Sequence, residues 1–150
     1  MNVELTGITD EQLLQEGVEQ NVAVGHFCQL LEGAKRPLLV AYNAQFDLNF
    51  LYHFLRPFGK VGVLRLPRFL DALTVYKDRR DYPHKLANAI EAYQLGDRVV
   101  NSHRAVDDAK ATADIYVKFL EMLRERKVSS LNEVNEVCKP TPDMIKKMPT

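Results

Sequence analysis

The sequence from Pro37 to Asp47, PLLVAYNAQFD, predicts a buried strand that leads directly into a helix. Residues 37–41 are almost wholly apolar, which is typical of a strand covered on both faces. Apolar residues then recur at helical spacing as far as Leu55, and Pro57 should stop that helix. Asp47 therefore follows the carboxyl end of a strand, where open α/β sheets bind their ligands. A simpler explanation stands beside this one, because the helix dipole favours any acidic residue in a first turn.

On either side of this stretch, hydrophobic spacing and capping residues predict a helix-rich α/β domain with two strands. Thr9 and Gln12 form a capping box, and the second strand should lie at 69–71. Helices are expected at about 9–16, 18–33, 46–55, 71–76, 85–93, 105–126 and 129–138. In two of them the spacing also predicts the buried residues, namely Phe46, Phe50, Leu51, Phe54 and Leu55 in one, and Ala109, Ala113, Tyr116, Leu120 and Leu123 in the other.

The composition is that of a globular protein with a genuine core. A chain of 150 residues corresponds to one domain, and 46% of its residues are hydrophobic. The 20 basic and 20 acidic side chains give zero net charge, which argues against a passive nucleic-acid-binding protein but not against an enzyme with a metal centre. Short, interrupted apolar stretches predict no membrane span, and the amino terminus has no signal-peptide pattern. The chain is therefore expected in the cytoplasm, or in the nucleus of a cell that has one, with Cys28 and Cys138 as reduced, packed thiols.

A second polar segment, His103 to Asp108, has the sequence HRAVDD and leads into the long carboxy-terminal helix. Asn101 or Ser102 is positioned to cap that helix, which would put His103 in the loop and Asp108 one turn inside. The two side chains would converge if the loop curls back. If the segment stood alone, a surface histidine and acidic residues at a helix start would be the better explanation.

Together, the two segments resemble motifs of the DEDDh 3′–5′ exonucleases, the DnaQ-like proofreading family, whose fold is ribonuclease-H-like. The segment 43–47 resembles the second motif of the family, and a histidine followed by four residues and an aspartate resembles the third. Residues 5–9 resemble the turn before the first large helix of the family, and Asp71 ends what looks like a short strand of the family. Because the order and spacing of the motifs agree, the resemblance covers about residues 5–123.

The resemblance implies a nuclease that removes nucleotides from the 3′ ends of single-stranded DNA or RNA and releases nucleoside monophosphates. It implies two divalent cations, Mg²⁺ or Mn²⁺, held by four carboxylates around the scissile phosphate. Asp47 and Asp108 match two of these ligands, and His103 matches the general base, since an imidazole with a pKa near ~6.5 can accept a proton from water. The implied nucleic-acid contacts are Thr6, Asn43 and Phe46. Asp107 matches no ligand position and should face solvent.

The first motif of the family, an Asp-x-Glu on the first strand, has no counterpart, because only five residues precede Thr6. The metal site is therefore expected to be incomplete in this chain. The fold is expected to be truncated at its amino terminus, so that helices dominate over a reduced sheet and the strand at 37–41 lacks a neighbour. A partial exonuclease-like domain should span 1–138, followed by a loosely ordered tail at 139–150. Tyr42 replaces a histidine that is common in the family, a change that we expect to be tolerated.

Three hypotheses follow. The chain is an exonuclease whose missing strands come from an upstream segment, a partner chain or a second copy, or were lost from a truncated gene model. Alternatively, it is a catalytically inactive, exonuclease-derived module that binds nucleic acid or self-associates through its exposed strand. A helical domain with chance motif matches is the third hypothesis, and the order and spacing of the motifs argue against it.

Overall fold

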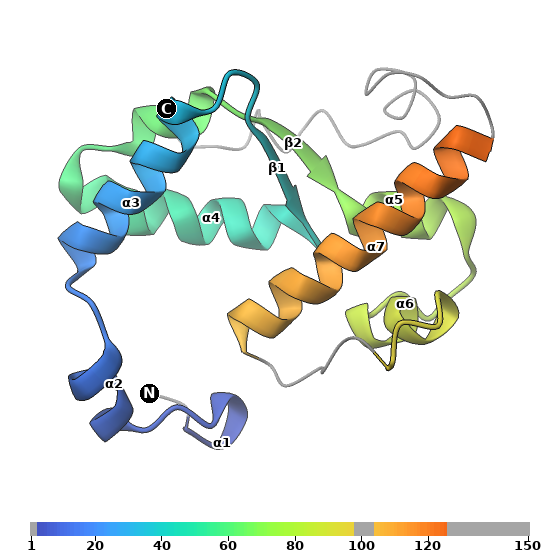
Figure 1. Ribbon diagram of the computed structural model, residues 1–150, viewed down its shortest axis with the longest axis horizontal. Coiled ribbons are helices and arrows are strands. Elements are labelled where there is room, and N and C mark those ends of the chain that lie inside the picture. The colour runs from blue at the N-terminus through green and yellow to red at the C-terminus, as the bar shows by residue number, and fades with distance from the viewer. Residues whose placement is uncertain (1–2, 98–103, 126–150) are drawn as a thin grey trace.

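Helices make up most of the structure, a computed structural model that describes residues 3–97 and 104–125 (Figure 1). The α-helices are α1 (Val3–Thr6), α2 (Asp10–Glu16), α3 (Gln20–Gly33), α4 (Ala44–Leu55), α5 (Ala72–Arg79), α6 (Leu86–Ala92) and α7 (Ala105–Glu125). The strands are β1 (Leu38–Ala41) and β2 (Arg68–Asp71), and the 3-10 helices are η1 (Arg56–Phe58) and η2 (Val61–Arg65). The helix-rich α/β fold that the sequence predicts is confirmed.

The two strands pair in parallel, with Leu38 opposite Arg68 and Ala41 opposite Asp71. Between them the chain passes through α4, because parallel strands need a crossover connection. The carboxyl ends of both strands therefore lie side by side, at Ala41 and Asp71. No strand among residues 3–97 and 104–125 pairs with the other edge of β1, so the described sheet has the open edge that the sequence predicts.

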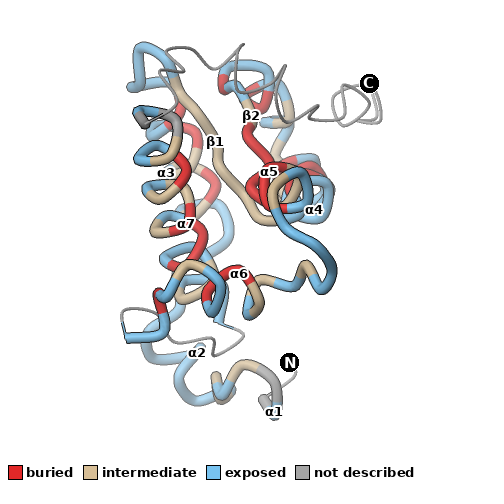
Figure 2. The backbone as a smooth tube through the Cα atoms, turned by 90° about the vertical axis from the view of Figure 1, so that its right-hand side faces the viewer, coloured by how far each residue is buried: buried red, intermediate tan, exposed pale blue. Residues whose placement is uncertain are grey.

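The side chains of β1 alternate between two hydrophobic clusters, one on each face of the sheet. Leu38 and Val40 pack against a cluster built from β2, α5, α6 and α7, whereas Leu39 packs against a cluster built from α3, α4 and η2. All four residues of β1 are nevertheless only half-buried, as the tan tube in Figure 2 shows. Both faces of β1 are therefore covered, as predicted. The residues of β1 are less buried than predicted, because no described strand covers the open edge.

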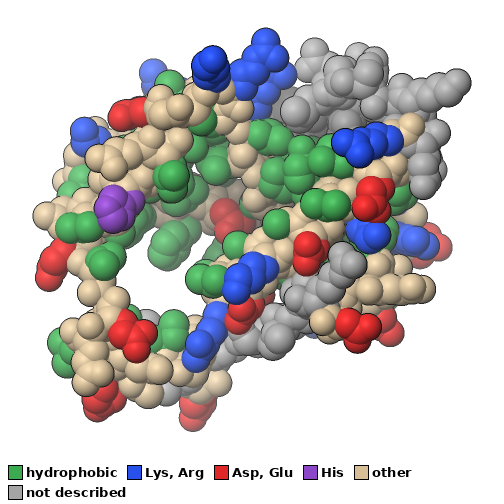
Figure 3. Space-filling view, in the orientation of Figure 1, with side chains coloured by type: hydrophobic (Ala, Val, Ile, Leu, Met, Phe, Trp, Pro, Cys, Tyr) green, Lys and Arg blue, Asp and Glu red, His purple; other side chains and the backbone are tan. Residues whose placement is uncertain are grey.

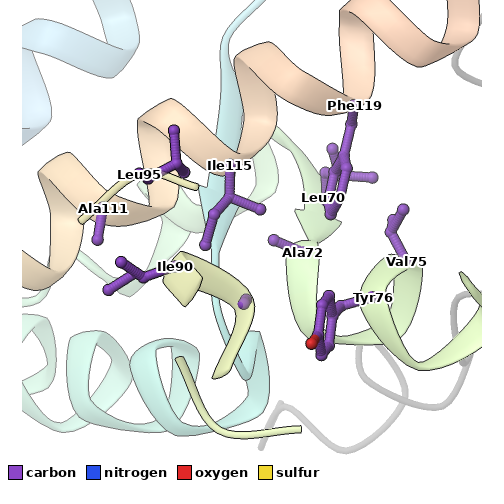
Figure 4. Packing of buried hydrophobic residues seen from close by; sticks show 10 residues of the cluster. Leu70, Ala72, Val75, Tyr76, Ile90, Leu95, Ala111, Ile115 and Phe119 are labelled. Carbon is purple, nitrogen blue, oxygen red and sulfur yellow. The ribbon is translucent and has the colours of Figure 1, made fainter. Parts of the chain in front are cut away.

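The larger cluster fixes α7 against the sheet (Figure 4). Ile115 of α7 is fully buried, and Phe119 extends toward Leu70 of β2. Burying a side chain of this size stabilises a fold by roughly 1.5–3 kcal/mol. The packing sets the position of the start of α7 relative to the carboxyl ends of β1 and β2.

The predicted buried stripe of α4 is wrong in part. Phe46 and Phe50 are 70% and 65% exposed, and the buried face of α4 consists instead of Ala44, Leu48, Tyr52 and Leu55. Because α4 is apolar on more than one face, hydrophobic spacing alone does not identify the face that packs against the sheet.

In α7 the same ambiguity leads to the same error. The buried side chains are Ala111, Ile115 and Phe119, whereas Ala109, Ala113 and Leu120 are exposed and Tyr116 is half-buried. α7 starts at Ala105 as predicted, and the carbonyl oxygen of Arg104 accepts hydrogen bonds from the amides of Asp107 and Asp108. Asn101 and Ser102, the predicted capping residues, lie outside the described residues.

The amino-terminal helices extend away from the sheet. The capping box of α2 is present as predicted, with Thr9 and Gln12 as reciprocal partners, but α2 has no buried residue. Figure 3 shows an opening between these helices and the rest of the molecule, bordered in part by hydrophobic side chains. Apolar surface is thus left uncovered on this side.

Three further expectations concern single features. Cys28 is a buried, free thiol, as predicted. The helix expected at 129–138, Cys138 and the tail at 139–150 lie outside the described residues. In the part of the chain that is described, no helix is both long and apolar enough to cross a membrane.

Candidate active site

The turn from β1 to α4 presents Asn43 and Phe46 at the surface. Asn43 has a left-handed backbone conformation (φ 70°, ψ 57°), which asparagine tolerates better than most residues. Its carbonyl oxygen accepts a hydrogen bond from the amide of Phe46 over 2.9 Å, and its side chain makes no cap to α4. Both side chains are exposed beside the carboxyl end of β1, and both are therefore accessible to a ligand there.

Asp71 holds this turn in place from the neighbouring strand. Its side chain is only 8% exposed, and its Oδ1 accepts hydrogen bonds from the amides of Asn43 (2.9 Å) and Leu73 (3.0 Å). One carboxylate thus fixes the start of α5 and the turn into α4. The sequence analysis placed Asp71 at a strand end but gave it no role. The available signal was an aspartate directly before a helix, which is a preferred N-cap residue.

The Asp47 carboxyl responds to the charges of two other aspartates, Asp71 and Asp108. Partial removal of the Asp47 carboxyl from water raises its pKa above the ordinary value, against the lowering effect of a backbone hydrogen bond. The negative charges of Asp71 and Asp108 raise it further. Asp108, from the other predicted motif, and Asp71, which the prediction omitted, are therefore near enough to Asp47 for their charges to act on it.

The first turn of α7 carries Asp108 to this position. Its amide donates to the carbonyl oxygen of Arg104 over 3.0 Å, and its own carbonyl oxygen accepts from Thr112 Oγ1 over 2.8 Å. Asp107, predicted to face solvent, is partly covered, with a side-chain exposure of 27%, and its Oδ1 lies 4.0 Å from Lys110 Nζ. Asp108 is half-buried on the same turn.

Thr6 is tied to the start of α7 through Arg104. Nε of Arg104 donates to the carbonyl oxygen of Thr6 over 2.9 Å, and Nη2 lies 3.4 Å from the carbonyl oxygen of Gly7. Thr6 Oγ1 accepts from the amide of Ile8 over 3.3 Å. The turn that carries Thr6, a predicted nucleic-acid contact, is thus held against the residue that precedes α7. His103, the predicted base, lies outside the described residues.

A loop between α5 and α6 adjoins the same end of the sheet. Tyr42, next to Asn43, donates from its hydroxyl to the carbonyl oxygen of His84 over 2.8 Å, with the carbonyl oxygen of Lys85 at 3.3 Å. Burial of the phenol raises the pKa of Tyr42, and the nearby Tyr76 and Asp71 raise it further. Tyr42 remains a neutral donor as a result, and it fixes the position of the loop.

The oxygen ligands gathered here are of the kind that Mg²⁺ and Mn²⁺ bind. The described residues contain no group of three or more His, Cys, Asp or Glu side chains arranged to hold a metal ion. The aspartates therefore fit a divalent cation by ligand type, whereas a full set of ligands is not assembled within residues 3–97 and 104–125.

Comparison with known proteins identifies related sequences. The sequence model described as Exonuclease matches residues 2–116. The chain is 36% identical to a DNA polymerase III PolC-type protein of Caldanaerobacter subterraneus over 97% of its length, and 35% identical to that of Clostridium perfringens over 97%. It is 33% identical to the 3′-5′ exonuclease DinG of Bacillus subtilis over 89% of its length. The chain spans only 10% of the two PolC-type proteins and 14% of DinG, and no solved structure matches it significantly.

Proposed function

Because the chain belongs to the exonuclease family, we propose that it hydrolyses DNA or RNA from the 3′ end and releases nucleoside monophosphates. The observation that carries the proposal is the position of Asp47 and Asp71 after the carboxyl ends of two parallel strands, with the charges of Asp71 and Asp108 both acting on Asp47. Clustered carboxylates repel one another, and bound cations offset that repulsion. The carboxyl ends of parallel strands are also where open α/β sheets bind ligands.

We propose Mg²⁺ or Mn²⁺ as the cofactor, with Asp47 and Asp108 as two of its ligands. A bound pair of such cations supplies positive charge to the phosphate and lowers the pKa of water. The other ligands come from outside the described residues in this proposal, since those residues hold no complete set. Asp71 acts differently, because one of its oxygens is already committed to the amides of Asn43 and Leu73.

The remaining roles belong to residues around this centre. His103 accepts the proton of the attacking water, a task suited to an imidazole at neutral pH. Asn43 and Phe46 contact the terminal nucleotide, and their exposure at the end of β1 supports that role. Thr6 contacts the same nucleotide from the turn that Arg104 holds.

The test is Mn²⁺-dependent release of label from a 3′-labelled single-stranded oligonucleotide by the purified chain. Asp47→Asn should abolish the release, whereas Glu32→Gln, a change of an exposed acid in α3, should leave it unchanged. His103→Ala and Asp108→Ala should abolish it with little loss of stability. Activity that survives in the His103→Ala protein would come from a contaminant, and the proposal would fall.

The open edge of β1 favours a second candidate function, a non-catalytic module that self-associates. Val106 and Val117 of α7 are exposed and apolar, as are Phe46 and Phe50 of α4, and within residues 3–97 and 104–125 no strand pairs with the second edge of β1. A second copy of the chain that adds a strand to this edge would pair its backbone groups. This candidate predicts a dimer that needs no metal.

Light scattering coupled to size-exclusion chromatography separates the two candidates. A dimer that persists in EDTA, dissociates in Val117→Lys and lacks nuclease activity would favour the second candidate. A monomer with Mn²⁺-dependent activity would contradict it. The control is Leu14→Lys in α2, where the leucine is also exposed but lies away from β1.

A further inference from the structure

We propose that the loop between α5 and α6 binds unpaired nucleotides upstream of the 3′ end, with Tyr82 stacking on a base and Arg80 and Lys85 pairing with phosphates. This inference rests on the proposed function, because the loop needs a nucleic-acid substrate whose end lies at the aspartates. It adds the preference for a single strand and the residues responsible for that preference.

Tyr82 has the exposure and the support that a stacking platform needs. It is 84% exposed, and its ring lies 5.9 Å from that of His84 at 85°. The ring of His84 in turn lies 5.8 Å from that of Tyr76, which is buried in the core. His84 Nε2 also lies 2.8 Å from the carbonyl oxygen of Arg80. The exposed ring thus lies against His84, whose own contacts lead to the core at Tyr76.

The charge of the loop favours a polyanion. The loop (80–85) has two basic residues and one acidic residue, and together with the end of α5 the segment 77–85 contains four basic and two acidic residues, whereas the whole chain has no net charge. Arg80 and Lys85 are exposed, and the guanidinium carbon of Arg80 lies 5.6 Å from the ring centre of Tyr93. An aromatic platform flanked by cations is the usual combination for single-stranded nucleic acids, because every base has a face that can stack.

The loop is also in the right place. The hydroxyl of Tyr42 donates to the carbonyl oxygen of His84 over 2.8 Å, and Tyr42 is adjacent in sequence to Asn43. A strand whose last phosphate lies at the aspartates would meet the basic loop with its preceding nucleotides. In this arrangement the aspartates would bind cations, and the basic residues of the loop would bind phosphates of the nucleic-acid backbone.

Fluorescence anisotropy measures the affinity of the loop for a 5′-labelled oligothymidylate of ten nucleotides, and EDTA prevents cleavage during the measurement. Tyr82→Ala should weaken binding about tenfold, whereas Tyr82→Phe should bind as the wild type does, because the ring is kept. Lys85→Gln should lower the slope of log affinity against log salt by about 0.7. The control is Leu66→Ala, an exposed apolar residue outside the loop. Wild-type affinity in Tyr82→Ala, or no binding by the wild type, would overturn the proposal.

Hydrolysis of the p-nitrophenyl ester of thymidine 5′-monophosphate separates this inference from the proposed function. The ester has no upstream nucleotide, so Tyr82→Ala should cleave it as the wild type does. Cleavage of the ester together with oligonucleotide binding that does not depend on Tyr82 would overturn the proposed stacking on Tyr82 and leave the proposed exonuclease activity standing. Oligonucleotide binding that depends on Tyr82, without any ester cleavage, would support the proposed stacking on Tyr82 and argue against the proposed exonuclease activity.

Discussion

Arg104 and Thr6 are 98 positions apart in the chain, yet Nε of Arg104 donates to the carbonyl oxygen of Thr6 over 2.9 Å. The same guanidinium reaches toward the carbonyl oxygen of Gly7, 3.4 Å away. A planar group with several fixed donors can serve two adjacent carbonyls, which a lysine ammonium does less well. The contact joins the amino-terminal turn, which carries the predicted substrate contact Thr6, to the residue that precedes α7.

Arg104→Lys should therefore loosen the amino-terminal turn while leaving the core intact. The loss of hydrogen bonding should be about 1 kcal/mol, and the turn has little other burial to compensate. Hydrogen exchange at the amides of Ile8 and Gln12 should become several-fold faster, with core amides unchanged. Arg124→Lys, at the exposed far end of α7, is the matched control. Equal exchange in the variant and the wild type would show that the turn is held by other contacts.

Asp71 should matter for stability more than its single position suggests. Asp71→Ala leaves the partly buried amides of Asn43 and Leu73 without their acceptor, which should cost about 1–3 kcal/mol in the free energy of unfolding. Asp71→Asn keeps an acceptor oxygen and should cost less than half as much. Urea denaturation measures both values. Equal losses in the two variants would mean that the charge, and not the acceptor, is what stabilises the turn.

Much of the fold follows from local pattern. The β1–α4 junction was predictable because a short apolar strand, a turn residue and a helical repeat succeed one another within residues 37–55. The capping box of α2 was predictable because both of its partners lie within four residues. The faces of α4 and α7 were not predictable, since exposure of Phe46 and burial of Ile115 depend on which neighbours pack against each helix.

The candidate site likewise has residues that the sequence indicated and contacts that it did not. The motifs indicated Asp47 and Asp108, because each stands at a recognisable start of a helix. They did not indicate that the charge of Asp71 acts on Asp47, since that depends on the parallel register that sets Ala41 opposite Asp71. The contact of Arg104 with Thr6 is likewise a product of tertiary structure. His103 lies outside the described residues, and its role stays a prediction.

Ile115 provides a test of the core that is independent of function. Ile115→Ala should lower the free energy of unfolding by about 2–5 kcal/mol, because the side chain is fully buried between the sheet and α6. Val117→Ala, two residues away on the exposed side of α7, should change it by less than about 1 kcal/mol. Urea denaturation of both variants gives the comparison. Similar losses at the two positions would mean that the exposed side of α7 is covered in solution.

The pKa of Asp47 offers the most direct test of the carboxylate cluster. Partial burial and the charges of Asp71 and Asp108 raise this pKa above its ordinary value of 3.8, so the folded chain keeps the proton to a higher pH than the unfolded chain does. Asp47 therefore contributes stability at pH values below 3.8 that is lost as the pH rises through its folded pKa. Cation affinity should change in the opposite sense and increase over the same interval, because the carboxylate binds cations and the neutral acid does not. Titration of the Asp47 side-chain carbon by NMR measures the pKa.

Two variants assign the cause of that shift. Asp71→Asn and Asp108→Asn should each lower the pKa of Asp47, with the larger decrease in Asp71→Asn, because Asp71 exerts the stronger of the two charge effects. Asp97→Asn, an exposed acid after α6, should leave it unchanged. Saturating Mg²⁺ should lower the pKa in the wild type by occupying the carboxylate. A pKa of Asp47 that does not respond to either neighbour would show that the three carboxylates do not share a site in solution, and the proposed metal centre would lose its principal support.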